Sequence, residues 1–88
     1  MTYRVEFTGA ARRDIAKLPE RVACAVLEFC AGPLARNPHR VGRPLIGDLT
    51  GLHSARRGEY RVIYAIHDDT VLVEVAYLQR RSDLRRPR

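Results

Sequence analysis

The chain has 88 residues, enough for one small domain with a single core and no separate cofactor domain. Hydrophobic residues make up 45% of it and charged residues 30%, which is typical of globular proteins. The 16 basic and 10 acidic side chains give a net charge of +6, and Lys17 is the only lysine. A GC-rich genome would favour arginine, but arginine also binds phosphate through a bidentate fork, so an anionic partner is expected.

Membrane-spanning, secreted and metal-binding classes are not supported. The longest nearly apolar run, residues 22–31, is broken by Glu28 and is too short to cross a membrane. The first residues lack the apolar region of a signal peptide. Cys24 and Cys30 fit neither a metal motif nor a disulfide framework, and both are interpreted as small buried hydrophobic residues. We therefore expect a cytoplasmic protein without a membrane partner, a metal or a cofactor.

The first half of the chain predicts one strand followed by two helices. Residues 3–7 alternate between apolar and polar side chains, as in a strand. Thr8 stands where a helix N-cap is expected, before a helix over residues 10–18. A second helix is expected over residues 20–36, with an interruption at Gly32-Pro33. The two helices predict an antiparallel αα-hairpin.

The second half predicts a loop over residues 37–51 and then a β-meander. Its three strands are expected over residues 52–57, 60–67 and 71–78, joined by two tight turns. One face of the meander must pack on the helical hairpin. We therefore expect an α+β fold, a two-layer sandwich in β-α-α-β-β-β order, as a single domain over residues 1–88. The opposite face of the sheet is expected to be partly open and to carry any site.

Side chains alternate between the two faces of a strand, and this assigns the arginines. Counting along the last two strands places Arg61 and Arg80 together on the open face. The same counting places Tyr60, Tyr64 and Tyr77 toward the helices. The open face would then lack the aromatic residues on which RNA-binding modules stack bases.

Further basic residues are expected to converge on Arg61. They are Arg56 and Arg57 before the tight turn, and Arg81, Arg85 and Arg86 in the basic tail over residues 79–88. Together they would form a rim that grips phosphate. The alternative is an ordinary solvated face, with Arg61 paired to Glu74 across the strands, beside a solubilising tail.

The sequence lacks the motifs of zinc proteases, serine hydrolases and nucleotide-binding loops. RNA cleavage, however, requires no metal: a base deprotonates the 2′-hydroxyl, which attacks the adjacent phosphate, and cations stabilise the phosphorane. Arg61 and Arg80 are candidates for this stabilisation. His53, next to Ser54, is a candidate proton carrier.

Residues 51–64 read GLHSARRGEYRVIY, a Leu-x-Gly pattern that leads into a Tyr-Arg-hydrophobic-hydrophobic-Tyr strand. With its surroundings from Pro44 to Asp83, this stretch resembles the RelE group of toxins in the RelE/ParE superfamily. The opening YRVEFTGAARRDIAKLP is similar to the start of the same group, so the resemblance covers nearly the whole chain. It implies a sheet of four strands with two helices.

The resemblance also implies the toxin of a type II toxin–antitoxin system. Such a toxin is a metal-independent endoribonuclease that cleaves mRNA in the ribosomal A site and so inhibits translation. A small RelB-like antitoxin wraps it with helical segments in a hetero-oligomer, and the free toxin is expected to be monomeric. A basic groove predicts acidic or apolar antitoxin segments that cover it.

The resemblance assigns two arginines. Arg61 matches the family's strand arginine at the scissile phosphate, and Arg80 matches a second arginine after the last strand, with Arg81 as the neighbouring choice. The remaining candidates for RNA binding are Ser54, Arg56, Arg57, Arg85 and Arg86. The lysines and C-terminal tyrosine usual in the family are absent, which leaves the base and the acid open: either His53 substitutes, or arginine and the ribosome transfer the protons. The alternative functions are a ParE-like inhibitor of DNA gyrase without nuclease activity, and a non-catalytic RNA-binding module.

Overall fold

The computed structural model describes residues 2–80. Its helices and strands follow each other in the predicted order, with short additional elements before the central strands. They are β1 (Arg4–Phe7), α1 (Gly9–Ala16), α2 (Glu20–Phe29), a π-helical turn (Cys30–Leu34), α3 (Pro38–Val41), β2 (Arg43–Pro44), β3 (His53–Arg57), β4 (Tyr60–His67) and β5 (Leu72–Arg80). No helix in residues 2–80 is long and apolar enough to cross a membrane.

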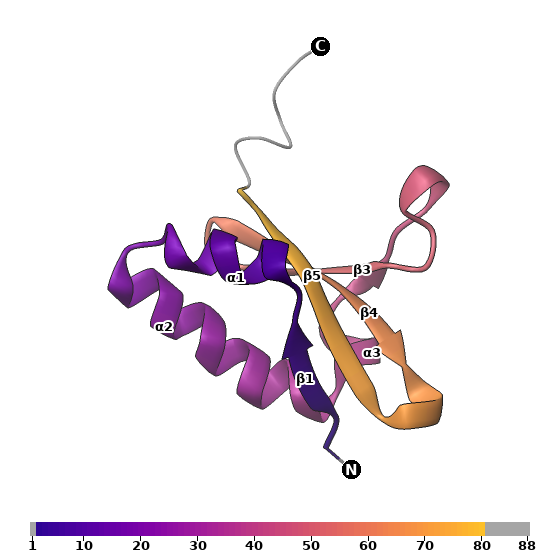
Figure 1. Cartoon of the computed structure of the whole chain (residues 1–88). Coiled ribbons are helices and arrows are strands. Elements are labelled where there is room, and N and C mark those ends of the chain that lie inside the picture. Colours follow the sequence, from indigo (N-terminus) through magenta and orange to yellow (C-terminus); the bar gives the residue numbers. More distant parts are fainter. Residues whose placement is uncertain (1, 81–88) are drawn as a thin grey trace.

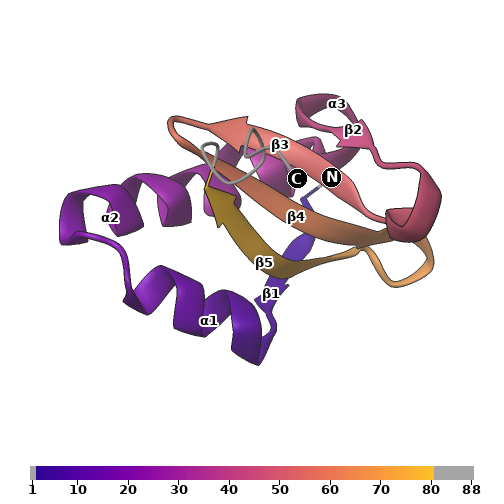
Figure 2. The same ribbon diagram turned by 90° about the horizontal axis from the view of Figure 1, so that it is seen from above.

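The strands form one five-stranded sheet in the order β1-β5-β4-β3-β2. β1 is parallel to β5, and the other neighbours are antiparallel. Side chains of α1 and α2 pack on one face of this sheet, beside which both helices lie in Figure 1. The predicted α+β sandwich is therefore confirmed. The predicted loop over residues 37–51 was wrong in part, because it contains α3 and the edge strand β2, which lie next to β3 in Figure 2.

The core lies between the helices and the sheet. Its members with the least exposure are Ala11, Val26, Cys30, Leu34, Ala55, Val62, Tyr64, Val73 and Val75. Burial raises the pKa of the Cys30 thiol to about 11, so it stays neutral and packs as a small hydrophobic residue. The same interpretation was wrong for Cys24, which is exposed on α2.

The break at the end of α2 occurs where Gly32-Pro33 predicted it. Pro33 lacks an N–H and cannot continue the regular hydrogen bonds of an α-helix. The backbone widens there into the π-helical turn, which still buries Leu34 completely. The interruption thus redirects the chain toward α3 without opening the core.

Thr8 joins the first helix to the sheet. Its hydroxyl accepts a hydrogen bond from the amide of Ala11, as an N-cap does, at 3.1 Å. The same hydroxyl donates to the carbonyl oxygen of Ala76 in β5 at 2.5 Å. The predicted cap is therefore confirmed, and it also fixes α1 against β5.

Thr8→Ala is expected to lower the free energy of unfolding by about 1–2 kcal/mol, because it removes both the helix cap and the hydrogen bond to β5. Chemical denaturation at neutral pH measures this change. Thr8→Ser retains the hydroxyl and serves as the control. Equal losses in the two variants would contradict the assigned role of the hydroxyl.

A β-bulge interrupts the pairing of β4 with β5. Ile63 lies opposite Tyr77, whereas the next residue, Tyr64, lies opposite Val75. Ala76 is therefore an extra residue in β5. Such an insertion reverses the face of every later side chain of that strand relative to simple alternation.

The reversal is visible in the residues that follow the bulge. Leu78 packs in the core, although alternation predicted it on the open face. Tyr77 is opposite Ile63 and lies on the open face rather than toward the helices. Arg80 is opposite Tyr60, so it lies on the side of the helices. The prediction that Arg61 and Arg80 share a face was therefore wrong.

Candidate functional site

Arginines from three neighbouring strands line a cavity of about 420 Å³ on the open face of the sheet. Its lining residues are Val41, Gly42, Arg43, Ser54, Arg56 and Arg61. We call this the arginine cavity. It contains three of the residues predicted for the site, namely Ser54, Arg56 and Arg61.

Strand pairing places these side chains together. Arg56 on β3 lies directly opposite Arg61 on β4, and Ser54 lies directly opposite Arg43 on β2. Directly opposed residues of antiparallel strands point to the same face with closely spaced Cβ atoms. The cavity is thus built on regular strands, which hold its side chains more rigidly than a loop would.

No carboxylate among residues 2–80 pairs with an arginine of the arginine cavity. Within residues 2–80, Arg4 forms an ion pair with Glu6, and the other acid–base contacts are those of His39 with Asp68 and of His67 with Glu74, which are ion pairs only when the histidine is protonated. The alternative in which Glu74 pairs with Arg61 was therefore wrong, since Glu74 lies opposite Ala65 and contacts His67 at 3.5 Å. Three guanidinium groups beside each other repel, and a bound anion would relieve that repulsion.

Two polar atoms of this face are buried without a hydrogen-bond partner among the described residues. They are the hydroxyl oxygen of Ser54 and the Nε of Arg61. A buried polar group without a partner costs about 1–3 kcal/mol, so such groups are uncommon unless a ligand completes them. An N–H donor and a hydroxyl beside extra cations fit the oxygens of a phosphate.

Arg80 and Arg57 lie away from the arginine cavity. Both are directly opposite Tyr60, on the side of the sheet that carries the helices. The guanidinium carbon of Arg80 stands 5.8 Å from the centre of the Tyr60 ring, a cation–π contact. The bulge at Ala76 places Gln79, rather than Arg80, opposite Arg61.

His53 also lies away from the cavity. Its ring stacks on that of Tyr64, with centroids 5.5 Å apart and an angle of 23° between the planes. Burial lowers the pKa of His53, and the nearby His39 lowers it further. The position does not support the predicted role of His53 as the base acting on a ligand of the arginine cavity.

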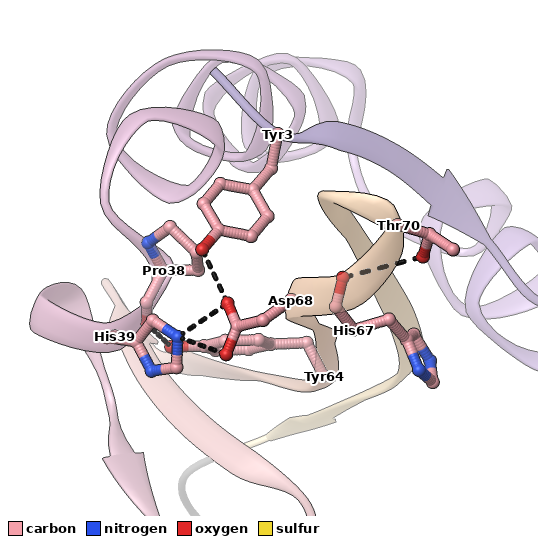
Figure 3. Close-up of polar contacts among 7 residues, drawn as sticks. All are labelled: Tyr3, Pro38, His39, Tyr64, His67, Asp68 and Thr70. Carbon is pink, nitrogen blue, oxygen red and sulfur yellow. Dashed lines mark hydrogen bonds and ion pairs between the residues drawn. The ribbon is translucent and has the colours of Figure 1, made fainter. Parts of the chain in front are cut away.

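A polar cluster joins three distant parts of the chain (Figure 3), and the ring of its His39 lies 6.1 Å from the ring of His53. Asp68, between β4 and β5, accepts a hydrogen bond from the Tyr3 hydroxyl at 2.6 Å and contacts Nε2 of His39 at 2.9 Å. These two hydrogen bonds lower the pKa of Asp68, and the bond to Asp68 raises the pKa of Tyr3. The hydroxyl of Tyr64 donates to the carbonyl oxygen of Pro38 at 2.6 Å. The cluster and Tyr64 thereby hold α3, which leads directly into the arginine cavity.

The stability of the protein is expected to fall as the pH is lowered below about 6.5, because His53 has a lowered pKa in the folded state. The unfolded chain then takes up the proton first, so the stabilising contribution is present above 6.5 and is lost as the pH falls toward the folded pKa. His53→Phe keeps an aromatic ring on Tyr64 and removes the titration. Urea unfolding at pH 7, 6 and 5 should show a shallower decline for the variant; an unchanged slope would contradict the prediction.

Sequence reasoning missed two contributors to the open face. Arg43 lies in a strand of two residues, too short for a periodic signal, and Tyr77 was assigned to the wrong face because the bulge was not foreseen. The argument that the open face lacks aromatic residues was therefore also wrong. Three predicted contacts, Arg81, Arg85 and Arg86, lie outside the described residues. Within residues 2–80, no three His, Cys, Asp or Glu side chains are grouped as metal ligands would be.

Comparison with known proteins identifies the family. Residues 5–84 match the family described as "ParE toxin of type II toxin-antitoxin system, parDE". The protein named Toxin RelE from Mycobacterium tuberculosis is 56% identical over 80 residues, which cover 91% of this chain and 82% of the relative. Toxin RelG from the same organism is 49% identical over 86 residues, which cover 98% of this chain and 99% of the relative.

The fold agrees with a solved structure of the same group. The crystal structure of the toxin–antitoxin complex RelBE2 from Mycobacterium tuberculosis contains a chain that matches with a TM-score of 0.90 and 48% identity. The match covers 94% of this chain and 95% of that chain. The chain described here therefore belongs to the ParE toxin family, and within the RelE/ParE superfamily it is a RelE-type toxin of a type II toxin–antitoxin system.

Proposed function

We propose that this toxin is a ribosome-dependent mRNA endonuclease that inhibits translation in the cytoplasm. The observation that carries the proposal is the arginine cavity: Arg43, Arg56 and Arg61 line it together, with no carboxylate partner among the described residues. An RNA phosphate would supply the missing negative charge. The unpartnered Arg61 Nε and Ser54 hydroxyl would then have oxygens to bind.

The proposed reaction is an internal transfer of the phosphate. The 2′-oxygen of the RNA forms a bond to the adjacent phosphorus, and the bond from phosphorus to the 5′-oxygen of the next nucleotide breaks. One proton leaves the 2′-hydroxyl and another is taken up by the departing 5′-oxygen. The products are a 2′,3′-cyclic phosphate and a 5′-hydroxyl.

The arginines contribute by stabilising charge. The phosphorane carries more negative charge than the starting phosphodiester, so fixed cations bind it more strongly and lower the barrier. The position of Arg61 on β4, with Arg43 and Arg56 on the strands beside it, supports this role. Among the described residues, none of the side chains that line the cavity is a carboxylate or a histidine. We therefore assign the proton transfers to arginine and to groups of the ribosome that come near the mRNA.

The partner that follows from this function is a RelB-like antitoxin that forms a hetero-oligomer with the toxin. A toxin related at 48% identity was crystallised in a toxin–antitoxin complex. A protein that cleaves mRNA must be held inactive in the cell that makes it. The high positive charge, +6 for the chain, favours an antitoxin with acidic segments.

Inhibition of DNA gyrase is the less favoured alternative. It would require no site for a phosphate and would leave the arginine cavity unexplained. The relatives with 49–56% identity also carry RelE-type names, although the family as a whole takes its name from ParE.

The test is to induce the toxin without an antitoxin and to map the 5′ ends of cellular mRNA. We expect new ends inside translated codons, carrying 5′-hydroxyl groups. Purified mRNA should be cleaved when ribosomes are present and should stay intact without them. Intact mRNA combined with signs of DNA damage would overturn the proposal in favour of gyrase.

A further inference from the structure

The hydroxyl of Tyr64 lies where α3 turns into β2. It donates a hydrogen bond to the carbonyl oxygen of Pro38, the first residue of α3, at 2.6 Å (Figure 3). The same hydroxyl lies against Gly42, the residue that follows α3, because a Cβ added to Gly42 would overlap it. One oxygen atom of β4 therefore meets the chain at both ends of α3.

This contact is buried, and the ring that carries the hydroxyl is held firmly. The side chains of Tyr64 and Pro38 are both fully buried. Burial raises the pKa of the Tyr64 hydroxyl to about 12, so it keeps its proton and remains a donor at neutral pH. The ring packs in the core and stacks on that of His53, with centroids 5.5 Å apart. A side chain locked by packing in this way gives the group at its tip a fixed position.

A second contact of α3 is far more exposed. His39 contacts Asp68 at 2.9 Å, but the exposed fractions of these two side chains are 53% and 59%. Exposed pairs of this kind contribute little to stability and are screened by salt. Removing the Tyr64 hydroxyl would instead leave the Pro38 carbonyl without this donor in a buried site, which is costlier. The contact made by Tyr64 is therefore the stronger of the two.

The position of α3 sets the position of Arg43. Arg43 follows Gly42 and begins β2, a strand of two residues. So short a strand has few hydrogen bonds of its own, and its place at the edge of the sheet depends on the segment that leads into it. Arg61 lies on β4 itself and lines the arginine cavity together with Arg43.

We propose that Tyr64 is a positioning residue of the arginine cavity, acting from the opposite face of the sheet. Its hydroxyl fixes α3 through Pro38 and thereby holds Arg43 beside Arg61, where both line the same cavity. Tyr64 itself does not touch the RNA. β4 thus holds Arg61 directly and Arg43 through Tyr64. The consequence for cleavage rests on the proposed function.

The first measurement follows the position of Arg43 without RNA. Tyr64→Phe removes the hydroxyl and keeps the ring. Tyr60→Phe is the matched control, because Tyr60 lies on the same strand and its hydroxyl forms no hydrogen bond within residues 2–80. In NMR spectra of the full-length toxin, which also show that each variant is folded, the amides of Val41 and Arg43 should exchange with solvent at least about five-fold faster in Tyr64→Phe, because local opening costs less without the hydrogen bond.

Tyr60→Phe should leave this exchange unchanged. His39→Ala, which removes the exposed contact with Asp68, should accelerate it by less than about two-fold. A larger effect of His39→Ala would show that Asp68 controls α3 and would overturn the role of Tyr64, even if Tyr64→Phe fails to fold.

The second measurement separates positioning from stability. Single-turnover cleavage of mRNA on purified ribosomes is followed at increasing toxin concentration. Tyr64→Phe should lower the rate at saturating toxin by about ten-fold or more and leave the half-saturating concentration nearly unchanged, because a misplaced cation matters most at the phosphorane. A toxin that was only less stable would need a higher concentration and would still reach the normal rate.

A double-mutant cycle tests whether the effect passes through Arg43. In a toxin that already carries Arg43→Ala, adding Tyr64→Phe should change the saturating rate by less than about two-fold, because the side chain that it positions is gone. In a toxin that carries Arg56→Ala, the same addition should still lower the rate by about ten-fold or more, because Arg43 is present.

The two proposals fail in different ways. Unchanged amide exchange in folded Tyr64→Phe, or a saturating rate equal to that of Tyr60→Phe, would overturn the role of Tyr64 and leave the nuclease function intact. An equal loss of rate with and without Arg43 would do the same. Faster exchange in a toxin that leaves mRNA intact would refute the nuclease function alone, and Tyr64 would still position Arg43.

Discussion

Arg61→Ala is expected to reduce the rate of mRNA cleavage by about 10²–10³-fold and to restore growth on induction. Removing one fixed donor that stabilises a developing oxyanion has effects of this size. Arg61 lines the arginine cavity directly opposite Arg56, and its Nε is buried without a partner among the described residues. Its loss would remove a charge that the bound phosphorane needs, while Arg56 and Arg43 would remain.

Arg61→Lys separates charge from geometry. Lysine keeps the positive charge but cannot form the planar fork, so cleavage should be intermediate. Arg12→Ala, at an exposed position on α1, is the control and should leave cleavage unchanged. The measurement is single-turnover cleavage of an mRNA on purified ribosomes. Full activity of Arg61→Ala would refute the assignment of the site to the open face.

Gly42→Ala is expected to destabilise the protein by about 1–3 kcal/mol, the usual cost of overpacking a tight contact. A Cβ at this position would overlap the hydroxyl of Tyr64 and lie 2.8 Å from the carbonyl oxygen of Ser54. The backbone at Gly42 is extended, a conformation that any residue can adopt. Glycine is required here because the chain approaches β3 too closely to leave room for a side chain. The overlap would push the chain away from β3 and displace Arg43, the next residue.

We therefore expect Gly42→Ala to lose cleavage activity as well as stability. Urea unfolding gives the first effect, and single-turnover cleavage under conditions where the variant is folded gives the second. Gly32→Ala is the matched control, because a Cβ there meets only the side chain of Arg36 at 3.6 Å. If the folded Gly42→Ala variant cleaved at the normal rate, the position of Arg43 would not matter for the reaction.

Local patterns were sufficient to predict the longer helices and strands of this fold, but not α3 or β2. Alternation defined β4 with its observed ends, and the N-cap at Thr8 and the interruption at Pro33 depend on nearest neighbours in the chain. The expectation that Arg56 lies near Arg61 also followed from the chain alone, because a two-residue turn sets the register of a hairpin. These signals are local and therefore readable from sequence.

The faces predicted for Arg80 and Tyr77 were wrong, because they depend on the register in which β5 pairs with β4. Nothing local marks Ala76 as an extra residue, yet that one residue moves Arg80 to the side of the helices and brings Tyr77 to the open face. The place of His53 away from the arginine cavity could not be predicted, because its aromatic neighbours, His39 and Tyr64, come from separate segments. Arg43 was missed because β2 exists only through its pairing with β3.

The place of β5 in the sheet has a consequence for the order in which the toxin is made. β5 lies between β1 and β4, and its first residue, Leu72, pairs with Arg4 at the start of β1. β1, the first strand to be synthesised, therefore has no neighbouring strand until β5, the last described strand, has been made. Such distant contacts slow folding, since the entropy of closing the long loop must be lost first. A nascent chain interrupted before Leu72 lacks the strand that joins the two halves of the sheet, so translation must proceed through β5 before the toxin can form.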